Sequence, residues 1–116
     1  MSKEDSKRDA IASRLRTARE AAGLSQGQVA KILSMHRPTI SEAEAGRRKV
    51  SAEELAEFAR IYHVKMSWLA CIEETEVNPQ QDRLLLAARE LSNLKPEDFN
   101  RLMEFLIALR AEDGNK

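Results

Sequence analysis

The sequence predicts an all-α protein in which a five-helix domain precedes a two-helix hairpin. Of its 116 residues, 42% are hydrophobic and 33% charged, with only 4 Gly and 3 Pro, and this mixture favours folded helix over disorder. Apolar residues recur every three or four positions, and two capping boxes mark helix starts. The length is close to that of one domain, so a large multidomain enzyme is not expected.

The first two helices are separated by a glycine. The first starts near Asp9 and stops at Gly23, because one stripe of it is apolar: Ile11, Leu15, Ala18 and Ala22. Ser25 begins the second, since its hydroxyl can accept from a backbone amide that has no partner inside the helix. Gln28, three positions later, completes a capping box. We therefore expect a short second helix directly after the turn.

A third short helix starts near Arg37 and ends before Gly46. It follows a break at residues 34–36, and Pro38 fits its first turn, where a missing amide hydrogen costs little. Two short helices separated by such a break form a helix-turn-helix, whose second helix is sized to enter the major groove of DNA.

Two more helices complete a domain over residues 8–73. Ser51 and Glu54 form another capping box, followed by core-facing residues at helical spacing: Leu55, Phe58, Ala59 and Tyr62. A short fifth helix, whose tryptophan closes the core, is predicted by Met66, Trp68, Leu69 and Ile72. Residues 74–81 are polar and acidic with one proline, which predicts a linker.

Residues 82–112 predict a helical hairpin, the second helix of which is opened by Pro96. The apolar arc of that helix is wider than one neighbour needs. We expect the hairpin to form a homodimer through Leu84, Leu85, Ala88, Leu91, Phe99, Leu102, Phe105, Leu106 and Leu109. The alternative is that both helices fold back on the N-terminal domain.

Charge is separated along a formally neutral chain. Residues 1–50 hold 11 Lys and Arg against 6 Asp and Glu, a net +5, and residues 51–116 hold 8 against 13, a net −5. A basic half attracts polyanions such as DNA through Coulomb steering and counterion release. The alternative is a solvated helical surface that is basic without function.

Other classes of function lack their sequence signals. Cys71 cannot form an internal disulfide, and with His36 and His63 it lacks zinc-ligand spacing, so neither a metal site nor a cofactor is expected. There is no nucleophile elbow or phosphate-binding glycine loop, so we expect no enzyme. No apolar run suits a membrane span or a signal peptide. We expect a cytoplasmic, nucleoid-associated protein that does not bind membranes.

The order and spacing of a set of residues resemble those of Cro and lambda-repressor type regulators, the xenobiotic-response-element (XRE) family. The resemblance runs from about Ile11 to Leu69 and is carried by Gly23-Leu24-Ser25-Gln26, Val29-Ala30, Ile40-Ser41, Glu44 and Gly46. It implies a five-helix, lambda-repressor-like domain that binds DNA sequence-specifically. Ser34 stands where the family has a turn glycine, so we expect it to adopt a left-handed conformation.

The resemblance also implies which residues face base edges: Arg37, Pro38, Thr39, Ser41 and Glu42. Their chemistry is suitable. Arg37 can donate to O6 and N7 of guanine, Glu42 can accept from a cytosine amino group, and the Pro38 ring can touch a thymine methyl. The alternative for Arg37 is an exposed arginine without a role, in a position where its charge opposes the helix dipole.

By the same resemblance, the phosphate contacts are Gln26, Arg47, Arg48 and Lys49, and His36 is added to them on its own chemistry. They add affinity without sequence information. His36 would bond phosphate when protonated, and the alternative is an ordinary exposed turn histidine. Arg19 and Glu44 would form a structural ion pair between the first and third helices, with Gln26 bracing the recognition helix.

We therefore expect a dimeric transcriptional regulator that represses at a palindromic operator in double-stranded DNA. Two recognition helices would enter successive major grooves about 34 Å apart. The alternative is an antitoxin or anti-factor that binds a partner protein through its acidic C-terminal half and autoregulates its operon. Residues 46–69 also resemble regulators encoded beside a metallopeptidase that inactivates them. A toxin and a regulatory metallopeptidase are therefore candidate partners.

Overall fold

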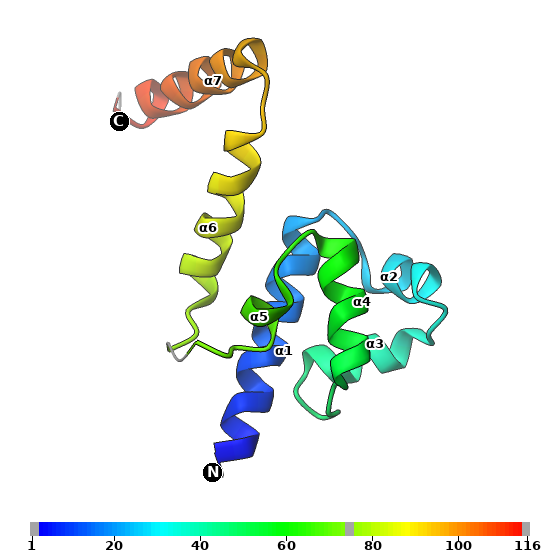
Figure 1. Ribbon diagram of the computed structural model, residues 1–116. Coiled ribbons are helices and arrows are strands. Elements are labelled where there is room, and N and C mark those ends of the chain that lie inside the picture. Colours follow the sequence, from blue (N-terminus) through cyan, green and yellow to red (C-terminus); the bar gives the residue numbers. More distant parts are fainter. Residues whose placement is uncertain (1–2, 74–75, 115–116) are drawn as a thin grey trace. The chain divides into compact units, whose positions relative to one another are not determined.

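The structure is a computed structural model that describes residues 3–73 and 76–114, and all regular structure in these residues is helical (Figure 1). The helices are α1 (Lys3–Ala21), α2 (Gln26–Ile32), α3 (Arg37–Glu44), α4 (Ala52–Tyr62), α5 (Met66–Leu69), α6 (Pro79–Ser92) and α7 (Pro96–Gly114). The predicted all-α class is confirmed. The chain divides into two compact units, the first ending at Leu86 and the second beginning at Ala87.

The core of the first unit is built from buried side chains of the helices α1 to α5, together with Leu86 of α6. The α2 and α3 helices pack on each other, α3 also packs on α1, and α4 and α5 pack on each other and on α1. The largest fully buried side chains come from four of these helices: Leu15, Val29, Ile40 and Leu69. The apolar residues that recur at helical spacing in the sequence therefore form the buried face of each helix.

Local capping signals place the helix starts. Ser25 accepts a hydrogen bond from the backbone of Gln28, whose side chain accepts one from the backbone of Ser25. Ser51 and Glu54 repeat this arrangement at the start of α4. Each box satisfies two backbone amides that the helix itself leaves without partners.

Two turns depend on left-handed backbone. Ser34 has φ 55°, as expected for a residue that stands in place of a turn glycine. Gly46 has φ 76°, and a Cβ added there would lie 2.5 Å from Oδ1 of Asp9. A side chain at Gly46 would therefore face both backbone strain and a collision with α1.

Two helices of the five-helix domain differ from the predicted bounds. The α1 helix begins at Lys3 rather than near Asp9, with Glu4 and Asp5 in its first turn, where carboxylates favour the helix dipole. The α5 helix ends at Leu69, so Ile72 does not belong to it and is 64% exposed. The chain leaves that helix through Cys71, whose φ is 54°.

The α6 helix begins at Pro79, inside the stretch predicted as a linker. Asn78 caps it, because its Oδ1 accepts from the backbone amides of Gln80 at 3.0 Å and Gln81 at 3.3 Å. Asp82 and Leu86 are buried in the first unit. The first turns of α6 therefore belong to the core of the N-terminal unit.

The second unit exposes most of its apolar side chains. Among its described residues, only Leu91 and Leu102 are half-buried and the rest are exposed. The large exposed apolar residues of α7 are Phe99, Met103, Phe105, Leu106, Ile107 and Leu109. No helix in the described part of the chain is both long and apolar enough to cross a bilayer.

Candidate nucleic-acid interface

The α3 helix has one buried face and one open face. Ile40 and Ala43 point into the core. Arg37 and Pro38 are exposed at the N-terminal end, and the other residues predicted to face bases are half-buried: Thr39, Ser41 and Glu42. The packing of α3 on α2 and α1 thus leaves the flank predicted to meet bases accessible.

Arg37 makes no ion pair with the described residues, and its side chain is exposed. Its guanidinium therefore keeps its donors for an external partner. His36 precedes it as the N-cap of α3, where its side chain makes no capping bond. Both side chains stand at the end of the helix that a major groove would receive first.

Glu42 is tied to the loop after α3. Arg47 Nη1 donates to Glu42 Oε1 at 3.3 Å, and the backbone amide of Arg47 donates to the carbonyl of Glu42 at 3.0 Å. The Arg47 side chain is 68% exposed and the Glu42 side chain 44% exposed, so this ion pair is weak and can exchange for another partner. In the free protein it offsets a carboxylate that would otherwise repel phosphate.

Three helices meet at Glu44. Arg19 Nε lies 2.7 Å from Glu44 Oε2 and Arg19 Nη2 lies 3.0 Å from Oε1, a two-pronged contact between α1 and α3. The hydrogen bond to Glu44 raises the pKa of Arg19 above its ordinary value, against a smaller opposing effect of burial. Gln26 Nε2 donates to Glu44 Oε1 at 3.1 Å. This contact ties the start of α2 to α3 and uses one of the two amide hydrogens of Gln26, the residue predicted to contact phosphate.

Arg48 is bound to α4. Its Nη2 lies 2.7 Å from Glu54 Oε2 and its Nη1 lies 3.1 Å from Oε1. These hydrogen bonds raise the pKa of Arg48 and lower the pKa of Glu54. The sequence shows no sign of the pairing, because Glu54 already has a role there in the capping box. Lys49, by contrast, is exposed and makes no ion pair with the described residues.

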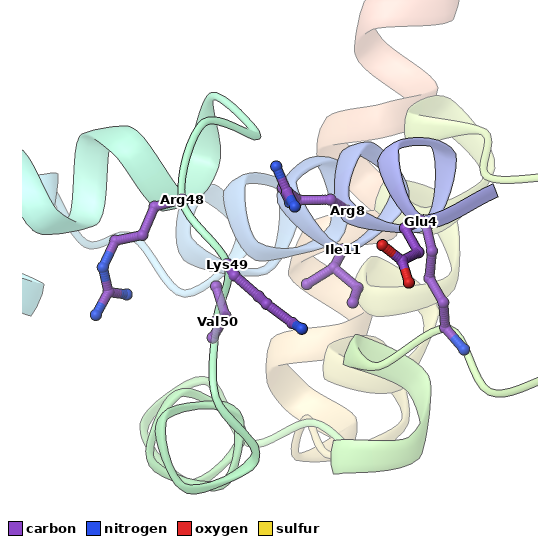
Figure 2. A pocket seen from close by; sticks show the side chains of 7 residues that line it. Glu4, Arg8, Ile11, Arg48, Lys49 and Val50 are labelled. Carbon is purple, nitrogen blue, oxygen red and sulfur yellow. The ribbon is translucent and has the colours of Figure 1, made fainter. Parts of the chain in front are cut away.

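A groove of about 180 Å³ lies between the loop after α3 and the start of α1 (Figure 2). Ile11 and Val50 supply its apolar side chains, and Lys49 extends along it, whereas Arg48 points the other way. Lys7 and Arg8 line it from α1. Sequence patterns did not single out these two cations, which α1 brings beside the loop.

Comparison with known proteins identifies the central part of the chain. Residues 10–67, half of the chain, match the model of a family described as a helix-turn-helix domain. The matched range contains every residue predicted for base and phosphate contact, and it ends before Trp68, α6 and α7. Neither the curated proteins nor the solved structures include a match to this chain.

Proposed function

The chain belongs to the helix-turn-helix domain family, and we propose from this premise that it regulates transcription by inserting α3 into the major groove of a specific DNA site. The observation that carries the proposal is the accessible flank of α3. Arg37 is exposed and without an ion pair among the described residues, while Ile40 and Ala43 fix the opposite face of the helix in the core. A rigid helix with a free guanidinium at its N-terminal end suits bidentate recognition of guanine.

The phosphate backbone would be held around this helix. Gln26 keeps an amide hydrogen beside the start of α2, and Lys49 lies in the loop beyond α3. His36 and Arg47 complete the set, Arg47 after exchanging Glu42 for phosphate. Such contacts fix the register of the protein on DNA, and base contacts then supply specificity.

We further propose that the DNA-bound form is a homodimer and that it acts as a repressor by occupying a palindromic operator. Five residues of α7 lie on one helical stripe: Phe99, Leu102, Met103, Leu106 and Leu109. All but the half-buried Leu102 are exposed, and a lone soluble protein rarely leaves so many neighbouring apolar side chains uncovered. A second copy would cover this stripe and double the number of bases read.

An antitoxin or anti-factor is the second candidate, because residues 51–116 carry a net −5 next to the same apolar stripe. A basic partner protein would then take the place of the second copy. Light scattering on the purified chain distinguishes the two: a dimer supports the homodimer, and a monomer favours a different partner.

The main experiment is selection of bound sites from a random duplex pool. We expect a palindromic motif whose half-sites lie about 10–10.5 base pairs, or a multiple of that distance, apart. Recovery of no enriched motif, with binding that depends on salt but not on sequence, would overturn the proposal of a sequence-specific regulator.

A further inference from the structure

A buried arginine joins the DNA-binding domain to α6. Arg14 lies on α1 and is 7% exposed, and its Nε lies 3.2 Å from Oδ2 of Asp82, which is 6% exposed. Arg14 Nη1 donates to the carbonyl of Trp68 at 2.7 Å. The same guanidinium lies over the Trp68 ring, with its carbon 4.7 Å from the ring centroid. We refer to Arg14, Trp68 and Asp82 as the Arg14 clamp.

The Arg14 clamp fixes both the position of α6 and its rotation about its own axis. Arg14 has a fixed planar set of donors, and two of its nitrogens are used by partners on different segments of the chain. Leu86, four residues after Asp82 on the same helix face, is buried in the hydrophobic core. Two anchors one turn apart prevent α6 from rolling about its axis.

This anchoring determines which face of α6 is presented outward. With Asp82 and Leu86 turned inward, Leu84 and Leu85 remain 65% and 48% exposed. Trp68 and Asp82 lie beyond the residues that match the helix-turn-helix family, whereas Arg14 lies within them. The clamp thus connects the common domain to a part of the chain outside the family match.

We propose that Arg14 and Asp82 are positioning residues for operator recognition, which orient the Leu84–Leu85 face toward a second copy and so set the spacing of the two half-sites. The inference rests on the proposed function of a DNA-binding dimer. A buried ion pair is a weak source of stability, but its geometry can specify one arrangement among several. When two DNA-binding domains are connected rigidly, they bind tightly only to half-sites at the matching spacing. A flexible connection allows binding at many half-site spacings.

The test compares spacing discrimination in full-length variants. The duplexes are the selected operator and the same operator with two base pairs inserted between its half-sites. The insertion moves one half-site by roughly 7 Å and rotates it by roughly 70°. Asp82→Ala removes the clamp, and Gln81→Ala changes the exposed neighbouring residue on the same helix as a matched control.

We expect the wild type and Gln81→Ala to bind the lengthened operator at least about tenfold more weakly than the selected one. Asp82→Ala should show less than about a threefold difference, with binding to a single half-site unchanged. Equal discrimination by Asp82→Ala and the wild type would overturn the positioning role while leaving the proposed function intact. Failure of the wild type to bind any duplex specifically would instead refute the proposed function.

Asp82→Ala leaves Arg14 buried without its carboxylate, so a measurement on the unaltered protein is also needed. Hydrogen exchange should show the α6 backbone amides of residues 83–86 as strongly protected as those of residues 12–18 in α1. Exchange of these α6 amides at the rate of a fraying helix end would overturn the proposal. The double variant Arg14→Met/Asp82→Leu replaces the charges with apolar packing and should keep the stability of the fold. It should nevertheless lose spacing discrimination as Asp82→Ala does, and retained discrimination in this folded variant would overturn the positioning role.

Discussion

The Arg48 guanidinium lies against the Glu54 carboxylate, with Nη2 2.7 Å from Oε2 and Nη1 3.1 Å from Oε1. This contact ties the loop after α3 to the first turn of α4. The three neighbouring cations after α3 also differ in their ion-pair partners. Arg47 is paired with Glu42, Arg48 is paired with Glu54, and Lys49 has no ion pair among the described residues.

Lys49→Ala should therefore reduce nonspecific DNA binding more than Arg48→Ala. A lysine that neutralises one phosphate contributes about one unit to the slope of log affinity against log salt. We expect Lys49→Ala to lower the magnitude of this slope by about one on any duplex. Arg48→Ala should lower it by less, since Glu54 already neutralises Arg48. Fluorescence anisotropy across a salt series measures both, and equal changes would show that Arg48 leaves Glu54 for phosphate.

Arg37→Ala should weaken binding to the selected operator by roughly 1–3 kcal/mol and leave binding to random DNA unchanged. The reason is that, in the proposed function, its exposed guanidinium binds base edges rather than phosphate. Arg60→Ala, an exposed arginine on α4, is the matched control. Equal losses on operator and random DNA would contradict a base-reading role.

Glu44→Ala should destabilise the fold by about 3–5 kcal/mol, because it leaves the largely buried guanidinium of Arg19 without its carboxylate. Gln26 loses its anchor in the same variant. Urea unfolding followed by circular dichroism measures the free energy of unfolding. Glu42→Ala, on the same helix with a largely exposed ion pair, should change it by less than about 1 kcal/mol.

Stability should depend on pH through Glu54. Its pKa in the folded protein is lowered from the ordinary value of 4.5, chiefly by the hydrogen bonds from Arg48. A lowered folded pKa gives stability that is fully present above the unfolded pKa and is lost as pH falls through the folded pKa. We expect Glu54→Gln to be less stable than the wild type at pH 7. This difference should shrink as the pH falls below 4.5.

The Glu54→Gln variant isolates the charge because glutamine can still accept from the Ser51 amide in the capping box. Urea unfolding of both proteins from pH 7 to pH 3 measures the difference. A gap in unfolding free energy that stays constant over this range would assign the effect to packing rather than to the carboxylate charge.

Leu106→Glu should convert the proposed dimer to monomer, because it places a charge in the apolar stripe of α7. Arg101→Glu also introduces a carboxylate on α7, but at a side chain that is largely exposed, and it should leave the dimer intact. Light scattering after size exclusion measures the mass. A dimer that survives Leu106→Glu would place the interface elsewhere. Truncation after Asn78 is a poorer test, since it also removes the carboxylate that pairs with the buried Arg14.

Much of the local structure could be predicted from neighbouring residues. The capping boxes at Ser25 and Ser51 each depend on residues within one helical turn. The left-handed turn at Ser34 is instead what the family resemblance implies, because Ser34 stands in place of a turn glycine. The start of α3 near Arg37 follows from Pro38 in the same way. For the candidate site, the family resemblance indicated which residues of α3 face base edges, and the structure shows which of these residues are exposed to solvent.

The all-α class, the helix-turn-helix and the separation of charge between the two halves of the chain follow from the order of the amino acids alone. Which charges are buried depends on packing between distant segments. Asp82 lies 68 residues from Arg14 and follows a stretch predicted as a linker from the sequence, yet the two form a buried ion pair. A carboxylate becomes buried only when the fold brings it a cation and neighbouring packing, and these come from segments that no local pattern connects.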